Sequence, residues 1–577
     1  MIFDVSNYYI HFYYIHFSRK DCLSVSNRKR CFILKKNIFC EKSPVTYLYL
    51  ASIALYIISI LFINYVGRVW YSFDMYSDML VAEKMTESLS IFPADWIFGN
   101  QLYVVSTSVI AGILNLVFHN GFYAMATASS IMMILILLCF VWLCKPFLEK
   151  KYIIIGIFCL SGAIILGNSA SQFTQGFEII YTMASYYSCY IIGILFHLGI
   201  YIRMIYGKKV HPVLLVIAAL LAFALGMQSL RQTLVLYIPL VIIDVITLIG
   251  FAVKNKKIKI KNYNCFNLLC IFTNVLGYLF VKILPIRQYT IISPVAFCKS
   301  WSELYENFKF SYGAFFNMTG LSYCTYGIKW IPLFVCSCII CLFVITAIVL
   351  IIKNKDTSPE AKIIIFSVIS ILCVMIVGVF IFRIRAIYLF VWFITVVFSI
   401  VYVVKRVKRK KISVLVTVML LLVSGVNYAF NFGPDFLEFP TLYREYKDVV
   451  NELENDKINC IYVDFNTSPI IAACSDDKII SGTVCFDYDS ESKGLLYPSK
   501  YLSDTELFIN HSKYSTYVVF SNWTMDALDR EDNPEYKSKL FSKLVLVKEK
   551  QLSKVKYYFY KIKDESLIDY SILCDNK

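Results

Sequence analysis

The chain has 577 residues, of which 58% are hydrophobic and only 17% are charged, and its mean hydropathy is +0.63. A soluble globular chain has about 45–50% apolar and about 25% charged residues, so this composition excludes an ordinary soluble protein. The formal net charge of +16 is no sign of nucleic-acid binding, because Lys and Arg fall in short clusters between apolar blocks, as in the cytoplasmic loops of membrane proteins.

Residues 1–45 are aromatic and basic and lack the single apolar core of a signal peptide. We interpret them as a cytoplasmic tail; a spurious upstream start is the alternative. Apolar blocks of about 20 residues then predict some eleven membrane-spanning helices within 46–431. The spans are expected near 47–66, 122–144, 152–169, 179–202, 212–229, 233–253, 264–284, 331–352, 362–382, 386–404 and 412–431.

The basic loops predict the orientation. They lie at 145–151, 203–209, 254–261 and 405–411, with a weaker one at 353–362. With the N-terminus inside, all of them are cytoplasmic, as the positive-inside rule requires, and the C-terminus is outside. Counting the apolar segment 102–119 as a crossing would move these loops outside. We therefore expect it to lie at the outer interface or to dip in and return.

Three segments are then expected outside: the loops 67–120 and 285–330, and everything after about 431. The region 432–577 reads as a small extracytoplasmic α/β domain. A charged helical stretch at 443–454 precedes apolar, β-branched and aromatic runs at 460–465, 517–520 and 557–560, which predict strands. The predicted fold class is an all-α polytopic membrane bundle with this domain appended.

The first outer loop carries the most suggestive polar residues. Asp74 and Asp78 are four residues apart and share a face if the segment is helical, and Glu83 follows. Such carboxylates could take a proton from an acceptor hydroxyl or amine, or bind a divalent cation, the one cofactor we consider. The plainer alternative is a solvated acidic loop. Cys338 and Cys341 are two residues apart but lie mid-span without a partner pair, so the 19 cysteines predict neither a metal site nor a disulfide framework.

The order Ser77-Asp78, Ala82, Asp95-Trp96 and then an interfacial segment resembles membrane glycosyltransferases of the GT-C fold. These include the family 39 mannosyltransferases, the lipid A aminoarabinose transferases and uncharacterised bacterial relatives. The commoner pattern has an Asp-Glu pair, whereas Met79 follows Asp78 here. This leaves open which aspartate is catalytic, and the spacing favours Asp78.

The resemblance implies an inverting glycosyltransferase of the bacterial plasma membrane. Its donor would be a sugar on polyprenyl phosphate, and its acceptor a lipid, glycan or protein on the outer face, with an aspartate as general base. Membrane lipids are further partners, and nucleic acid is not. Glu83 and Trp96 become candidate sugar or acceptor contacts.

Arginines at outer helix ends suit the donor phosphate, because the guanidinium fork matches phosphate oxygens. Arg231, Arg383 and Arg385 are the candidates, and Tyr388 follows as a candidate contact. The alternative for each arginine is snorkelling or an ion pair at a helix end.

Glu178 is a further candidate contact, since it opens a span rich in Tyr181, Tyr186, Tyr187 and Tyr190, whose rings and hydroxyls suit carbohydrate or an ordinary membrane interface.

Two other classes of function remain open. Asp244, Glu178 and His197 could form a proton or substrate path in a transporter or lipid-linked-glycan flippase. No inverted repeat or pair of broken spans supports that reading. A non-catalytic envelope assembly protein is the third possibility.

Overall fold

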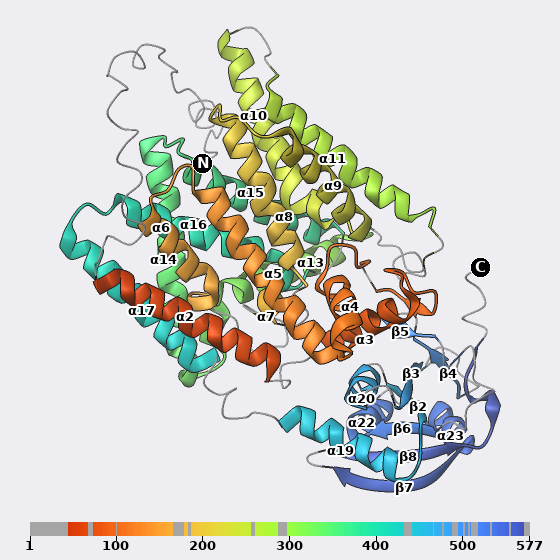
Figure 1. Cartoon of the computed structure of the whole chain (residues 1–577). Coiled ribbons are helices and arrows are strands. Elements are labelled where there is room, and N and C mark those ends of the chain that lie inside the picture. Colours follow the sequence, from red (N-terminus) through yellow and green to blue (C-terminus); the bar gives the residue numbers. More distant parts are fainter. Residues whose placement is uncertain are drawn as a thin grey trace.

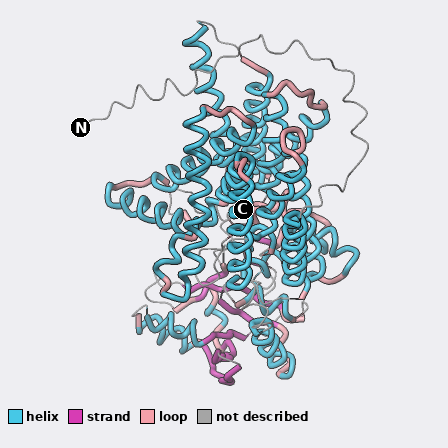
Figure 2. Tube along the Cα trace, turned by 90° about the vertical axis from the view of Figure 1, so that its left-hand side faces the viewer, coloured by secondary structure: helices cyan, strands magenta, loops and turns pink. Residues whose placement is uncertain are grey.

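The computed structural model describes most of the chain after residue 43. The described residues are 44–66, 73–99, 101–165, 178–182, 186–255, 260–284, 286, 297–381, 384–431, 441–464, 467–475, 478–486, 494–499, 502–505, 508, 517–530, 533–552 and 555–570. A helical region forms one part of the molecule and a β-sheet domain the other (Figure 1). Figure 2 shows the strands gathered at one end of the helices.

Eight helices of the described residues are long and apolar enough to cross a membrane. Between 28% and 72% of each apolar window is buried inside the protein, so the rest turns apolar side chains outward, where lipid can cover them. The chain is therefore an integral membrane protein. The eight are α2 (Pro44–Tyr65), α5 (Gly121–Cys144), α8 (Ser188–Ile205), α10 (Ile238–Asn255) extended by η4 (Thr233–Tyr237), α11 (Asn262–Val281), α14 (Ile331–Asn354), α15 (Pro359–Phe380) and α17 (Lys410–Asn431).

Three of the eleven expected spans form shorter helices. α6 (Lys150–Phe158) passes into the π-helix η2 (Cys159–Ala163), where Gly162 at φ 112° breaks the helical geometry. α9 (Pro212–Gln228) covers about 26 Å at 1.5 Å per residue, short of the roughly 30 Å hydrocarbon core. α16 (Val391–Arg406) is buried from Val391 to Val403, so it runs through the protein core rather than facing lipid.

Three of the basic loops meet at one end of the bundle. Lys405 forms an ion pair with Glu360 at 2.5 Å, and the Tyr206 hydroxyl donates to the Thr357 carbonyl oxygen. These contacts join three of the five basic segments. The shared end is what the sequence predicts; which side of the membrane it faces stays a prediction.

Two short helices lie between the bundle and the sheet domain, α3 (Phe73–Ser88) and α4 (Thr107–Phe118) (Figure 1). α4 is capped by the Ser106 hydroxyl and spans about 18 Å, too short to cross a membrane. It buries Ala111 and Gly112 and exposes Val117 and Ile113. Its length fits the expectation that this segment does not cross the membrane, and its place at the outer interface stays a prediction.

The other elements of the helical region are short or lie beside the spans. They are β1 (Trp96–Ile97), α7 (Glu178–Tyr181), α13 (Trp301–Thr319), η5 (Leu321–Thr325), η6 (Ile328–Trp330) and η7 (Ala386–Leu389).

The C-terminal domain contains a six-stranded sheet in the order β4-β3-β2-β6-β8-β7. β2 is parallel to β3 and β6, and the outer pairings are antiparallel. The expected strands and helix are present. The elements are α19 (Thr441–Asn455), β2 (Cys460–Asp464), α20 (Ser468–Cys474), β3 (Ile480–Phe486), β4 (Leu496–Pro498), β5 (Ser503–Asp504), β6 (Tyr517–Ser521), α22 (Asn522–Arg530), α23 (Pro534–Ser542), β7 (Leu544–Leu552), β8 (Val555–Ile562) and η9 (Glu565–Leu567).

The period of two along β2 gives the sheet two buried faces. Cys460 and Tyr462 pack with Leu528 of α22 and Leu540 of α23. Ile461 and Val463 face the other way, into a cluster that includes α19 and α20 and continues into α3, α4 and α5. The domain core is thus continuous with the part of the helical region that carries the first predicted carboxylates.

Candidate active site

The two predicted carboxylates lie on one face of α3. Asp78 is almost fully buried, with 2% of its surface exposed, while Asp74 is partly exposed one turn earlier. The Tyr186 hydroxyl lies 3.1 Å from Asp78 Oδ1, to which it donates, and 3.3 Å from the Asp74 carbonyl oxygen. This tyrosine therefore covers the Asp78 carboxylate.

Burial changes the acidity of the two groups to different extents. It raises the pKa of Asp78 to about 8, although hydrogen bonds from Tyr103 and Tyr186 partly offset the rise. Burial also raises the pKa of Asp74, to about 6, and the positive charge of Arg385 limits this rise. Asp74 therefore ionises at a lower pH than Asp78.

Arg231 lies in a cage of three tyrosines. Its guanidinium carbon is 5.1 Å from the ring centroid of Tyr187, 5.2 Å from that of Tyr190 and 5.3 Å from that of Tyr388. Its Nη1 donates to Gln101 Oε1 at 2.9 Å. Within the described part of the chain no carboxylate pairs with it at 4 Å or less. Tyrosine faces stabilise the cation but do not neutralise it, so the cage retains a positive charge.

Segment 101–103 connects the carboxylates to the arginine. Tyr103 hydrogen-bonds to Asp78, and Gln101, two residues earlier, accepts from Arg231. Gln101 also accepts a hydrogen bond from Tyr190 at 3.1 Å.

Two further segments make the same connection. Tyr186 contacts Asp78 and its neighbour Tyr187 faces Arg231. At η7, the positive charge of Arg385 favours the ionised form of Asp74, and the ring of Tyr388 faces the Arg231 guanidinium. Because two separate stretches contact both groups and a third contacts the arginine and acts electrostatically on Asp74, the carboxylates and the caged arginine belong to one site.

The other predicted contacts lie around this site or outside the described residues. Glu83 lies against Gly121 at the N-terminus of α5, where the helix dipole favours a carboxylate. Trp96 is 1% exposed in an apolar cluster with Met85 and Leu502. Arg385 is exposed at the start of η7.

Arg383 lies outside the described residues. Glu178 begins α7, but its side chain is outside the described part.

The intramembrane residues considered for a transport path lie elsewhere. Asp244 accepts hydrogen bonds from Tyr201 at 2.7 Å and Asn267 at 2.6 Å, toward the end of the bundle where the basic loops lie. His197 lies between backbone carbonyl oxygens and the Tyr237 hydroxyl. Among the described residues, neither Asp244 nor His197 is hydrogen-bonded to the candidate site, so the structure gives no support for a transport path through them.

Gln101 and Tyr103 were not predicted as site residues from the sequence, although both are polar groups at the edge of the expected interfacial segment. That position was the only available signal. Among the described residues no three His, Cys, Asp or Glu side chains gather as a metal site.

No protein-family model matches the chain, and no curated protein matches it. Among solved structures it is similar to ArnT from Cupriavidus metallidurans, whose crystal structure contains undecaprenyl phosphate. The sequence identity is 8%, the match covers 91% of this chain and 99% of that one, and the TM-score is 0.44. A likeness this loose carries no conclusion about activity.

Proposed function

We propose that the protein is a membrane glycosyltransferase that moves a sugar from a polyprenyl-phosphate-linked donor to an acceptor hydroxyl or amine at the outer face of the membrane. The main support for the proposal is that two carboxylates of α3 and the caged Arg231 lie in one connected site. Such a transfer needs a base for the acceptor and a cation for the leaving phosphate. The GT-C plan expected from the sequence fits this chemistry.

We assign the base to Asp74 rather than to Asp78, which the sequence pattern favours. A base must reach the acceptor and must be ionised at working pH. Asp74 is partly exposed and lies near Arg385, which stabilises its charge. Asp78 is covered by Tyr186, and burial raises its pKa to about 8. In this proposal Asp78 remains neutral and orients Tyr186 beside the acceptor.

Arg231 is assigned to the donor phosphate. The acceptor oxygen attacks the anomeric carbon while its proton passes to Asp74. The bond between that carbon and the phosphate oxygen breaks, and the phosphate leaves with the electron pair. Arg231 stabilises this charge because its guanidinium has no carboxylate partner among the described residues and keeps nitrogens available beyond the Gln101 bond. Arg385 is a second, more exposed cation at the same site.

Purified full-length protein in lipid nanodiscs tests the proposal. Radiolabelled polyprenyl-phosphate sugars are supplied one at a time, together with membrane extracts as the acceptor source. We expect transfer from one of them, loss of transfer in Asp74→Asn, and weaker donor binding in Arg231→Gln. Asp244→Asn is the matched control, because that buried carboxylate lies outside the site. Equal transfer by Asp74→Asn and wild type would reject the assignment, and loss of transfer only in Asp244→Asn would favour a transport-like role.

A further inference from the structure

The helix that carries the carboxylates is shared with the C-terminal domain. The apolar face of α3 buries Met75, Met79 and Ala82 in the same apolar cluster as Ile470 and Ile471 of α20. Figure 1 shows α3 at the boundary between the helices and the sheet domain. α3 therefore completes the core of a domain that follows it by several hundred residues.

A second contact ties the segment after α3 to the same domain. β1 pairs antiparallel with β5, with Trp96 opposite Asp504. The Thr505 amide and hydroxyl both donate to the Asp95 carbonyl oxygen at 2.7 Å. The end of the first loop is thus fixed to the domain through its backbone.

Lys84 connects these contacts to the helix itself. Its Nζ lies 3.2 Å from Asp504 and 3.5 Å from Asp95, as well as 3.5 Å from Glu87. Only 18% of the lysine side chain is exposed, so water screens these pairs less than it screens ordinary surface pairs. Lys84 is six residues after Asp78, about 9 Å along the helix axis.

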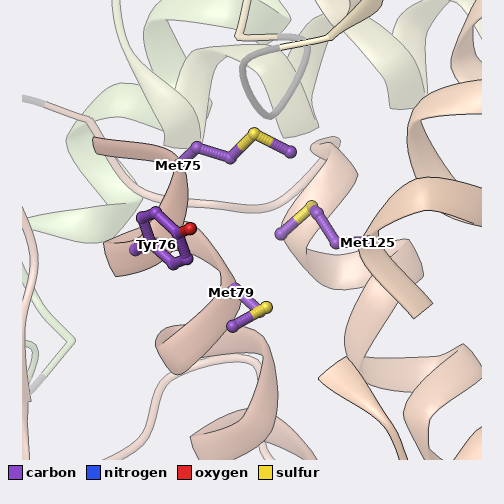
Figure 3. Close-up of a pocket in the computed structure, with 4 residues that line it drawn as sticks. All are labelled: Met75, Tyr76, Met79 and Met125. Carbon is purple, nitrogen blue, oxygen red and sulfur yellow. The ribbon is translucent and has the colours of Figure 1, made fainter. Parts of the chain in front are cut away.

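The side of α3 that faces α5 is held by flexible methionine side chains. Met75, Tyr76 and Met79 of α3 and Met125 of α5 line a small apolar recess (Figure 3). Methionine side chains are flexible and adapt to irregular gaps, so this packing resists a small rotation of α3 weakly. The same methionine face contacts both α5 and α20, so a contact with fixed polar partners is needed to set the direction of the carboxylates, and Lys84 supplies one.

We propose that the C-terminal domain aligns the carboxylate face of α3 with Arg231, and that Lys84 is the positioning residue that transmits this alignment through Asp504 and Asp95. The inference rests on the proposed function. Loss of the Lys84 contacts leaves α3 held on this side by flexible methionines, which lets the helix shift and moves Asp74 relative to Arg385. The Arg231 cage comes from other segments, so it stays intact.

Kinetics of full-length Lys84→Met and Asp504→Asn test this assignment. We expect kcat to fall about 10-fold or more, since a displacement of about 1 Å can cost that much, while KM for the donor stays within about 2-fold. Lys84→Arg should restore most of kcat, because its guanidinium reaches the same carboxylates. Glu535→Gln is the matched control: it breaks an exposed ion pair with Lys539 in the same domain and should change neither constant.

Amide hydrogen exchange gives a readout that does not depend on activity. Residues 73–88 should exchange faster in Lys84→Met and Asp504→Asn and at the wild-type rate in Glu535→Gln. Unchanged exchange and kcat in both variants would overturn the proposal, and so would a parallel loss of kcat and donor affinity. If the wild type transfers no sugar, the proposed function fails, and exchange alone then decides whether Lys84 positions α3.

Discussion

The pH dependence of transfer distinguishes the two aspartates. If Asp74 is the base, kcat/KM should follow a group whose pKa is about 6. About 9% of that group is ionised at pH 5 and about 91% at pH 7, so activity should rise about 10-fold over this interval and then level off. If Asp78 were the base, with a pKa of about 8, activity should still rise about 10-fold between pH 7 and pH 9.

Variants show which residue causes the rise of kcat/KM with pH, called the rising limb of the pH profile. Asp78→Asn keeps a neutral group of the same shape, so it should retain most activity at pH 7. Its limb should stay near pH 6, because Asp78 is neutral at that pH and does not repel the Asp74 charge. Arg385→Gln removes the positive charge that favours ionised Asp74, so the limb should move upward in pH. A 10-fold rise above pH 7 in the wild type, abolished in Asp78→Asn, would refute the assignment to Asp74.

Thermal stability supplies the control for folding. The rise of the Asp74 pKa from 3.8 to about 6 corresponds to about 3 kcal/mol. The free energy of unfolding decreases by this amount as the pH increases from about 4 through about 6. Below about pH 4 the carboxyl is protonated in both folded and unfolded states, and this loss is absent. Asp74→Asn cannot ionise, so it should melt at or above the wild-type temperature at pH 8. An inactive variant of this stability has lost its base rather than its fold.

Three further predictions concern the donor, the packing and the orientation. Arg231→Gln should weaken binding of a polyprenyl phosphate by about 2 kcal/mol, roughly 30-fold in Kd, measured by titration in nanodiscs, because it removes a charge-assisted contact. Gly226→Ala should destabilise the protein in a detergent melt, since its Cβ would collide with the Asn274 carbonyl oxygen between α9 and α11. Gly425→Ala meets open space and should be neutral or slightly stabilising. A reporter fused after residue 432 should be active outside the cell, and one fused after residue 151 should be active inside; the opposite result would reverse the predicted topology.

Local rules made part of the site predictable. A four-residue spacing placed Asp74 and Asp78 on one helical face, and the cost of charge at membrane depth singled out Arg231. Both rules depend only on neighbours in the sequence. The tyrosine-rich start of α8 was recognised for the same reason, and it contributes two walls of the arginine cage.

Other features depend on contacts that no local pattern contains. Asp78 is buried because Tyr186 and Tyr103 close over it. For this reason we propose Asp74 as the base, although the sequence pattern favours Asp78. Lys84 reaches Asp504 across 420 residues of sequence. The count of spans differs for a similar reason, because hydropathy does not reveal that α16 is surrounded by protein. Tertiary packing decided these cases.

The charge of the site follows from how each group responds to burial. A carboxyl can lose its charge by taking up a proton, whereas arginine keeps its charge and needs aromatic faces or hydrogen bonds instead. At pH 7 the described site therefore holds two positive charges, Arg231 and Arg385, against one negative charge, Asp74, and its net charge is about +1. A phosphodiester donor brings one negative charge and neutralises it. At pH 5 the protonation of Asp74 raises the net charge to about +2, so the donor should bind more tightly as the base is lost. The same pH series should thus show kcat and donor KM falling together below pH 6; a KM that rises there would contradict this distribution of charge.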